Sequence, residues 1–317
     1  PVVATSEVPT TADDYLAMAR ASMGKQGREQ SVIRQVDQSL KLRSTTDAFL
    51  IRAYANKDLE EHHEAITDLN KALQINPNYA PIYNNRGGSR RILGDYKGAI
   101  SDYNKALKLR PKYALAFAGR GDTNKNTGDY KGAIADYTKA IEIDQYLSVA
   151  YNNRGNVYDE SGDQQKAIAD YSKALELEPR YALAYYNRGI AMSNSGNQRG
   201  ALIDYSKAIE IDPLYANAYG NRGNAKRELG DHQGAIFDYT KAIQIDPQNP
   251  LNYYNRAFSK GESGDHKGQI SDYNKIILIN PQDARAYYYR GYAKYKSGDY
   301  KGAISDYGKI ILMNPKD

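Results

Sequence analysis

The chain has 317 residues, and its 43 lysines and arginines against 38 aspartates and glutamates give a formal net charge of only +5. This excess is spread over the whole length without a block of like charge, which argues against dedicated nucleic-acid binding. No apolar run approaches the roughly 18 residues of a membrane span. The lack of cysteine excludes a disulfide framework, a thiol nucleophile and a cysteine-based metal site.

The first part of the chain differs in pattern from the rest. It opens with Pro1 rather than Met, as expected for a fragment or for a mature form whose export signal has been removed, and we favour an exported or extracellular location over a cytoplasmic one. Residues 1–11 are rich in β-branched residues and proline, which predicts an extended arm. Residues 12–45 show the apolar spacing of two helices and are interpreted as a degenerate repeat. This spacing is carried by Tyr15, Met18 and Ala19 and then by Val32, Val36 and Leu40.

From residue 46 to the end, one pattern recurs every 34 residues without a slip in register. The eight copies are 46–79, 80–113, 114–147, 148–181, 182–215, 216–249, 250–283 and 284–317. A fixed period of this size indicates stacked helix pairs, because a single pair cannot bury its own apolar face. We therefore predict an all-α solenoid with one continuous core. Positions 1–34 below count from the first residue of each copy.

A single copy shows how the pair forms. In residues 80–113, helical spacing runs to Leu93, and Gly94 follows where a helix C-terminus favours positive φ. Asp95 is placed to cap the second helix through its carboxylate, and Pro111 ends that helix. The pattern predicts a helix, a tight turn, a second helix and a breaker.

Position 8 is always small although it lies in the middle of the first helix. Its residues are Ala53, Gly87, Gly121, Gly155, Gly189, Gly223, Ala257 and Gly291. Glycine in a helix interior costs about 1 kcal/mol relative to alanine. We expect the second helix to cross here, with alanines such as Ala99 against the glycine.

These residues resemble the tetratricopeptide repeat family over 46–317. The signature positions 4, 8, 17, 20, 24, 27 and 32 are occupied, in the second copy, by Tyr83, Gly87, Tyr96, Ala99, Tyr103, Ala106 and Pro111. The resemblance implies a right-handed superhelix whose first helices line a concave groove for peptides or partner proteins. Departures from the pattern are Gln145, Gln269, Ile276 and Ile310, which predict altered curvature towards the C-terminus.

The same resemblance places positions 2, 5, 9, 12 and 13 in the groove. In the last repeats these positions carry aromatic residues that are candidates for binding: Tyr186, Tyr254, Phe258, Tyr288, Tyr292 and Tyr295. Aromatic surfaces favour contacts with proteins or carbohydrates. Position 5 carries no lysine, so the version of the family that grips chaperone tails through that lysine is not indicated.

Arginine at position 7 and aspartate at position 23 occur together in every full repeat. The pairs are Arg52/Asp68, Arg86/Asp102, Arg120/Asp136, Arg154/Asp170, Arg188/Asp204, Arg222/Asp238, Arg256/Asp272 and Arg290/Asp306. A pair of residues that is repeated without variation more often stabilises the repeat than binds a ligand. We therefore interpret them as ion pairs between helices, with the recurrent lysine at position 26 as a further partner, rather than as an anion-binding ladder.

Glycine recurs at position 19 on the expected outer surface. The six residues are Gly98, Gly132, Gly200, Gly234, Gly268 and Gly302. We interpret them as drift within this chain, with close approach of another chain or of a surface sugar as the alternative. The sequence contains no N-x-Ser/Thr acceptor for N-glycosylation.

The two ends of the chain suggest how it acts. No solvating helix follows Pro315, so the last apolar stripe is expected to be bare, while residues 12–45 stand in phase to cover it from another copy. The predicted subunit interface comprises Val2, Val3, Val8, Tyr15 and Met18 at one end and Ile304, Tyr307, Ile310, Ile311 and Met313 at the other.

The resulting hypothesis is a non-enzymatic scaffold that associates head to tail into a filament or fibre. The alternative is a monomeric adaptor, part of a larger protein, that binds an extended peptide in its groove. No catalytic set, cofactor motif or metal site is predicted, since His62 and His63 are adjacent in a helix and point about 100° apart.

Overall fold

The computed structural model describes residues 9–313, and all regular structure in this range is helical. The prediction of an all-α solenoid of helix pairs is confirmed. The helices are α1 (Ala12–Ser22), α2 (Glu29–Leu42), α3 (Thr46–Asp58), α4 (His62–Ile75), α5 (Ala80–Ile92), α6 (Tyr96–Leu109), α7 (Ala114–Asn126), α8 (Tyr130–Ile143), α9 (Ser148–Glu160), α10 (Gln164–Leu177), α11 (Ala182–Asn194), α12 (Gln198–Ile211), α13 (Ala216–Glu228), α14 (His232–Ile245), α15 (Pro250–Glu262), α16 (His266–Ile279), α17 (Ala284–Lys296) and α18 (Tyr300–Met313).

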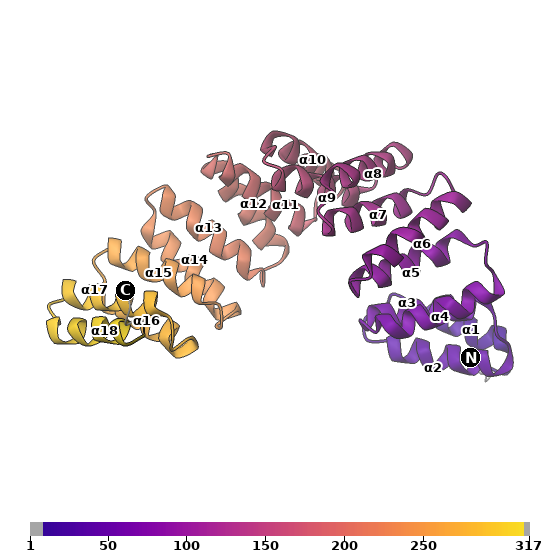
Figure 1. Ribbon diagram of the computed structural model, residues 1–317, viewed down its shortest axis with the longest axis horizontal. Helices are drawn as coiled ribbons and strands as arrows, with labels where there is room; N and C mark the ends of the chain where they lie inside the picture. The colour runs from indigo at the N-terminus through magenta and orange to yellow at the C-terminus, as the bar shows by residue number, and fades with distance from the viewer. Residues whose placement is uncertain (1–8, 314–317) are drawn as a thin grey trace, which may run out of the picture. The chain divides into compact units, whose positions relative to one another are not determined.

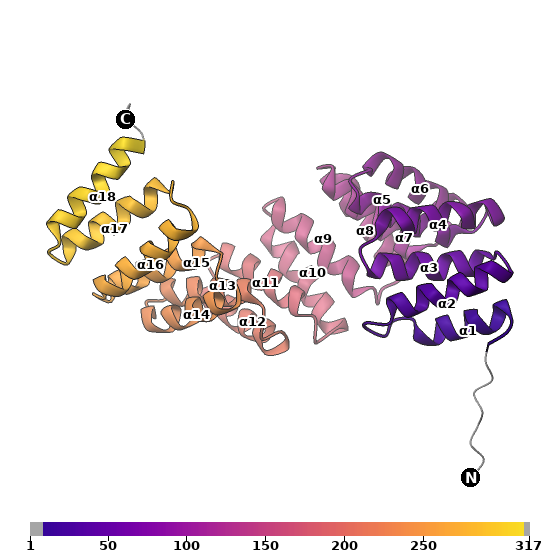
Figure 2. The same cartoon turned by 90° about the horizontal axis from the view of Figure 1, so that it is seen from below.

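The chain forms two compact units that divide inside α9, unit 1 ending at Val157 and unit 2 beginning at Tyr158. Within unit 1, Figure 2 shows α1, α2 and α3 lying side by side, and helices α1–α8 pack in chain order. Within unit 2, α10–α18 pack in chain order as well (Figure 1). We expected one continuous core from the sequence and did not foresee a division inside α9. Each repeat contacts mainly its neighbours, so burial is local along the stack.

First helices of neighbouring repeats also contact one another, namely α1 with α3, α5 with α7, α11 with α13 and α13 with α15. We call the surface of a unit that the odd-numbered helices form its first-helix face. This contact places the first helices on the more crowded side of the stack, as the resemblance implies for a groove.

The turns between paired helices use glycine where φ is positive. The residues are Gly94, Gly128, Gly162, Gly196, Gly230, Gly264 and Gly298, with φ between 78° and 86°. Glycine takes this conformation without a Cβ penalty. In the turn between α3 and α4 the same position is occupied by Glu60, with φ 63°. This is a non-glycine residue in a region that favours glycine.

The recurrent glycine at position 19 lies against the cap of its own helix. Asp95 caps α6 by accepting a hydrogen bond from the backbone N–H of Gly98 at 2.9 Å, and a Cβ on Gly98 would lie only 2.1 Å from the Asp95 carboxylate. The same contact recurs at Gly132, Gly234, Gly268 and Gly302. The close approach therefore comes from the cap of the same helix. The cap does not by itself require glycine, because Lys166 stands at the same position beside the Asp163 cap, so drift stays a prediction.

At position 8, the small residue faces a tyrosine ring. A Cβ on Gly223 would lie 2.7 Å from the Tyr239 ring, and one on Gly189 would lie 2.7 Å from the Tyr205 ring. The helices therefore cross at this point as expected. The neighbour nearest to the glycine is the tyrosine at position 24, whereas the alanine at position 20 was expected there.

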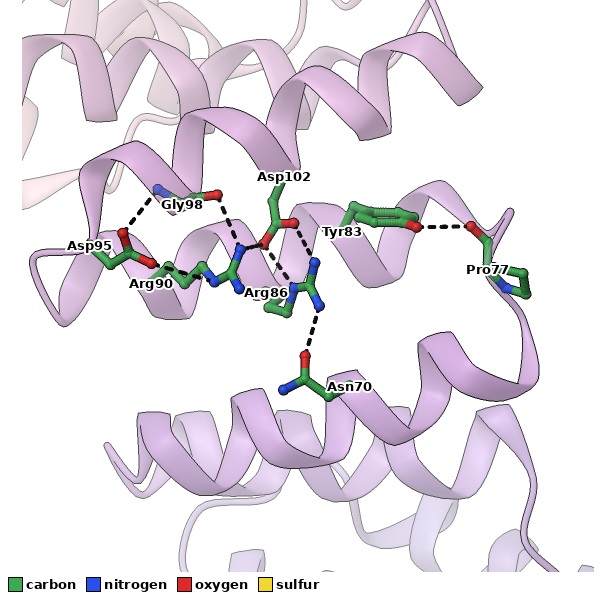
Figure 3. Close-up of polar contacts among 8 residues, drawn as sticks. All are labelled: Asn70, Pro77, Tyr83, Arg86, Arg90, Asp95, Gly98 and Asp102. Carbon is green, nitrogen blue, oxygen red and sulfur yellow. Dashed lines mark hydrogen bonds and ion pairs between the residues drawn. The ribbon is translucent and has the colours of Figure 1, made fainter.

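Each arginine at position 7 joins the two helices of its own repeat and also contacts the preceding repeat, as Figure 3 shows for Arg86. Arg86 donates to both carboxylate oxygens of Asp102, from Nε at 2.9 Å and from Nη2 at 2.6 Å, and its Nη1 donates to Asn70 Oδ1 at 2.7 Å. The bidentate pair recurs in Arg52/Asp68, Arg120/Asp136, Arg188/Asp204, Arg222/Asp238, Arg256/Asp272 and Arg290/Asp306. Arg154 belongs to unit 1 and Asp170 to unit 2, so that pair stays a prediction.

The additional partner of these aspartates is not the lysine at position 26. Arg90, at position 11, donates to Asp102 at 2.8 Å, and Lys226 and Lys260 take the same role in later repeats. Lys105, which was the expected partner, instead lies 5.9 Å from the centre of the Tyr83 ring. Position 11 faces the carboxylate on the second helix, whereas the exposed lysine at position 26 lies beside the aromatic ring at position 4.

Candidate protein-binding face

The aromatic residues predicted to line the groove lie on odd-numbered helices of unit 2. Tyr186 is on α11, Tyr254 and Phe258 are on α15, and Tyr288, Tyr292 and Tyr295 are on α17. The structure brings Phe258, Tyr288 and Tyr292 to one cleft of about 430 Å³. These three side chains are 50%, 53% and 45% exposed, which is unusual for such large apolar surfaces. Their role in binding is still a prediction.

The cleft owes its shape to two departures from the repeat. Gly261 stands at position 12, where long side chains are common in the other repeats, and Gln269 stands at position 20, where the other seven full repeats have alanine. A Cβ on Gly261 would lie 2.6 Å from the Gln269 amide nitrogen. The larger residue on α16 is therefore accommodated by a missing side chain on α15, and Gly261 and Gln269 both line the cleft.

Three further tyrosines form or support the cleft wall. Tyr273 and Tyr289 both line it, and their rings stack with centroids 5.9 Å apart and an interplanar angle of 18°. Tyr254 packs against both rings, and its hydroxyl donates to Asp283 at 2.9 Å. Burial is the first cause that raises the pKa of Tyr254, so its hydroxyl stays a hydrogen-bond donor. Tyr254 supports the cleft wall and does not line the cleft.

The remaining predicted groove tyrosines lie elsewhere. Tyr186 packs on Tyr215 with ring centroids 4.8 Å apart and accepts a hydrogen bond from Asn221 at 3.1 Å. Tyr295 packs against Tyr300 with centroids 5.6 Å apart. The structure therefore separates the six predicted residues into three at the cleft, one behind it and two away from it.

Sequence reasoning missed Tyr273, Tyr289, Gly261 and Gln269 as parts of this cleft. Tyr289 stands where five other repeats have asparagine, in the recurring Asn-Arg motif. The departures from the repeat were themselves the available signal. Their spatial meeting could not be seen without the packing of α15, α16 and α17.

A second unusual surface lies on α18. At position 28, Leu107, Leu175 and Ile243 are 6–9% exposed, whereas Ile311 is 66% exposed. Ile304 is 71% exposed, although its counterparts at position 21 are half-buried in every other repeat. In the preceding repeats, the following first helix covers this face. In the described structure the face of α18 has no such cover.

The other predicted interface residues are in mixed surroundings. Tyr307, Ile310 and Met313 are half-buried within the last repeat, Tyr15 is half-buried and Met18 is exposed on α1. Val2, Val3 and Val8 lie outside the described residues. The interface formed by these residues remains a prediction.

Comparison with protein families identifies the chain. Models described as tetratricopeptide repeat or TPR repeat match residues 46–79, 89–128, 115–146, 136–169, 155–196, 182–213, 216–249 and 284–317. The chain belongs to the tetratricopeptide repeat family. Proteins of this family are generally interaction scaffolds without enzymatic activity, and the fold described here is that of a protein-protein interaction scaffold. No match was found among curated protein sequences.

Solved structures show the same fold. The structure titled as a functional characterization of pilF from Pseudomonas aeruginosa has a TM-score of 0.58 at 18% identity, covering 64% of this chain and 92% of that one. A tetratricopeptide repeat protein from Parabacteroides merdae has a TM-score of 0.55 at 19% identity, covering 78% and 98%. MamA protein is 30% identical over 53% of this chain and 92% of its own, with a TM-score of 0.48. At these values the first two show the fold alone.

Among residues 9–313, no helix is both long enough and apolar enough to cross a membrane.

Proposed function

We propose that this protein is a non-enzymatic adaptor that binds an extended segment of a partner protein on the first-helix face of unit 2. The cleft bounded by Phe258, Tyr288 and Tyr292 supports this proposal. Half-exposed aromatic side chains around a concave surface gain free energy when a partner covers them, by about 25 cal/mol for each Å² of apolar area. Tyrosine also supplies hydroxyl groups for the partner backbone.

The chemistry of the cleft defines the side chain that it receives. Its walls are tyrosine and phenylalanine rings, and the charged residues that line it are Glu262 and Lys296, one of each sign. A bulky apolar or aromatic side chain fits this lining, because a charged side chain would lose its hydration against the rings. A backbone lying along α15 and α17 would leave its polar groups within reach of the tyrosine hydroxyls.

The test uses peptides selected from a random library against the full chain, with affinity measured by calorimetry. Phe258→Ala removes one wall of the cleft and Tyr292→Ala removes another. We expect each to weaken binding about tenfold or more, as central aromatic contacts do. Phe237→Ala is the matched control, because Phe237 is 57% exposed on α14, outside the cleft. Equal affinities for all four proteins would contradict the proposal.

Head-to-tail association into a filament is a second candidate, supported by the exposed Ile304 and Ile311 on α18. One observation weighs against docking by α1 in phase. Position 3 is buried in every full repeat, and α1 carries Asp14 there, exposed and hydrogen-bonded to the backbone N–H groups of Thr10 and Thr11. Burying this carboxylate against α18 would be unfavourable. We therefore rank the adaptor first.

Light scattering distinguishes the two candidates. If copies associate through α18, Ile304→Asp should block association without loss of helical circular dichroism, because that side chain is exposed in the single chain. A parent protein that stays a single chain at high concentration would contradict the filament. Oligomers that persist in Ile304→Asp would show that α18 is not the contact.

A further inference from the structure

The cleft of unit 2 contains a pair of polar residues that no other repeat has. Gln269 lines the cleft at position 20, where the other seven full repeats carry alanine, and it is only 9% exposed. His266 lies one turn earlier on α16 and lines the same cleft. We call these two residues the polar pair. A buried amide is hydrogen-bonded in a stable fold, so the partners of Gln269 determine what this part of the cleft offers to a ligand.

The partners of Gln269 also line the cleft. Its Oε1 lies 3.3 Å from His266 Nδ1. Burial is the main cause that raises the pKa of Tyr273 to about 12, and a hydrogen bond with the Gln269 side chain opposes this shift. A hydrogen bond that favours the charged phenolate is donated to its oxygen. The Gln269 N–H group therefore donates to Tyr273, which leaves Oε1 for His266.

Two other repeats show the difference that Gln269 makes. His62 and His232 also stand at position 17, but alanine follows them at position 20, namely Ala65 and Ala235. In both of these histidines, Nδ1 is buried and has no hydrogen-bond partner. The contact with Nδ1 therefore belongs to the repeat that carries Gln269 and helps to form the cleft.

This contact determines the tautomer of His266. Because Gln269 Oε1 can only accept, the hydrogen in the contact belongs to His266 Nδ1. A neutral imidazole carries one N–H group, and its other ring nitrogen is then an acceptor. Among residues 9–313, His266 Nε2 has no hydrogen-bond partner and is not buried. The polar pair therefore offers one free, uncharged acceptor.

Aromatic rings make up most of the remaining lining. Phe258, Tyr288 and Tyr292 are about half exposed, and the rings of Tyr288 and Tyr289 meet edge to face with centroids 5.3 Å apart. Such walls attract another aromatic ring in an offset or edge-to-face arrangement. A volume of about 430 Å³ is near the small end of ligand pockets, so the cleft accommodates one large side chain at a time.

The cleft has a second free acceptor. The Glu262 side chain is exposed, and within the described residues its carboxylate has no hydrogen bond or ion pair. The Lys296 ammonium lies 5.4 Å from the centre of the Tyr292 ring. A ligand that carries an N–H or O–H group on an aromatic ring satisfies a free acceptor, whereas phenylalanine leaves both without a partner.

We propose that the cleft of unit 2 selects an aromatic side chain that carries a hydrogen-bond donor, as tyrosine and tryptophan do, and that His266 Nε2 accepts this hydrogen bond. Gln269 is a positioning residue, because it acts by holding His266 in the tautomer that accepts at Nε2. The proposal rests on the proposed function in taking this cleft as the binding site. It adds which side chain of the partner enters the cleft.

The first experiment measures the preference of the full chain for blocked single amino acids. The probes are N-acetyl-tyrosinamide, its O-methyl ether and N-acetyl-phenylalaninamide, and the His266 ring resonances are followed by NMR. We expect the tyrosine probe to bind about fivefold more tightly than the other two, because only its hydroxyl can donate. Equal affinities of the three probes would overturn the proposal, as would His266 resonances that none of them shifts.

The second measurement needs no ligand. Nitrogen-15 shifts of the four histidine rings report which ring nitrogen carries the hydrogen when the imidazole is neutral. We expect the hydrogen at Nδ1 of His266 in the parent protein, and loss of this tautomer in Gln269→Met. Gln244→Met is the matched control, because Gln244 is an exposed glutamine on α14. A hydrogen at Nε2 in the parent, or an unchanged tautomer in Gln269→Met, would overturn the role of Gln269.

The variants then connect the tautomer to selectivity. Gln269→Met should weaken the tyrosine probe about fivefold and leave the phenylalanine probe within about twofold. His266→Phe removes the acceptor itself, assigns the His266 resonances and should abolish the preference as well. It keeps the test decisive if Gln269→Met disturbs the helix crossing. Equal weakening of both probes in the two variants would indicate a structural role alone and would overturn the proposal.

Failure of this proposal is distinguishable from failure of the proposed function. If no selected peptide binds in the cleft, the proposed function is wrong, whereas the tautomer and the preference among single amino acids are measured without peptides. If peptides bind in the cleft without an excess of tyrosine or tryptophan, the binding site stands and the selectivity proposed for the polar pair is wrong.

Discussion

The ring of Tyr239 lies against the backbone of Gly223, so closely that a Cβ on that glycine would be 2.7 Å from the ring. Tyr239 is fully buried, and its hydroxyl donates to Asn224 Oδ1 at 2.8 Å. The tyrosine therefore fills the space that the glycine leaves, and the pair determines how closely α13 approaches α14. The same relationship recurs in most repeats with glycine at position 8.

We expect Gly223→Leu to destabilise unit 2 by about 1–3 kcal/mol or more, because the added side chain overlaps a buried ring that cannot move away. Chemical denaturation monitored by circular dichroism measures this change. Gly308→Ala is the control, since a Cβ on Gly308 meets no atom within 4 Å. The free energy of unfolding of that variant should rise by about 0.5–1 kcal/mol, because alanine has a higher helix propensity than glycine. A neutral Gly223→Leu variant would refute the packing argument.

Glu60 adopts a backbone conformation that is adopted by glycine at the same position in the other full repeats. The φ of Glu60 is 63°, a left-handed conformation that strains a residue with a Cβ. Because glycine relieves this strain, we expect Glu60→Gly to stabilise unit 1 by about 1 kcal/mol. Gly94→Ala, at φ 80°, should destabilise by a similar amount. Thermal unfolding of the two variants measures both effects. A loss of stability in Glu60→Gly would mean that the glutamate side chain makes a contribution larger than the strain.

Arg222 and Asp238 test the ion pair at the helix crossing. Arg222 donates to the Asp238 carboxylate at 2.8 and 2.7 Å, and Lys226 also contacts it at 2.8 Å. Asp238→Ala should cost about 3–5 kcal/mol, because two cations lose their buried counter-charge. In a double-mutant cycle with Arg222→Ala, we expect a coupling energy of about 0.5–3 kcal/mol. Additive single changes would show that the arginine acts through Ser206 of the preceding repeat instead.

Asp306 gives a prediction for pH. Burial by itself would raise the pKa of Asp306, but hydrogen bonds from Arg290 and Lys294 outweigh it and hold the pKa below its ordinary value of 3.8. A carboxyl group with a depressed pKa in the folded state contributes stability above its unfolded pKa and loses it as the pH falls through the folded value. The stability of the parent relative to Asp306→Asn should therefore shrink below about pH 4. Urea unfolding between pH 7 and pH 3 measures the difference. A constant difference over this range would contradict the assignment.

Repeat period, helix pairing and turn positions were all predictable from the sequence, because these features depend on residues near one another in the chain. Gly94 at positive φ and Asp95 at the cap illustrate this. The prediction that arginine at position 7 pairs with aspartate at position 23 also agrees with the structure in the pairs described. In each of these cases, the same local spacing is repeated along the chain.

The partners across helices could not be predicted in the same way. The sequence assigned Ala99 to the glycine crossing and Lys105 to the aspartate, whereas the structure places Tyr103 against Gly87 and Arg90 on Asp102. Both choices depend on the rotation of one helix against another. That rotation is determined by the fit of all side chains at the interface and not by the spacing in either helix.

The candidate sites show the same division between what the sequence by itself determined and what only the tertiary structure decided. The sequence determined a stack of helix pairs with aromatic residues in its last repeats, because period and composition are properties of the chain. The tertiary structure decided that Phe258 and Tyr292 share a cleft while Tyr186 packs on Tyr215 away from it. These outcomes depend on which side chains fill or leave space between helices, and only packing in three dimensions determines that.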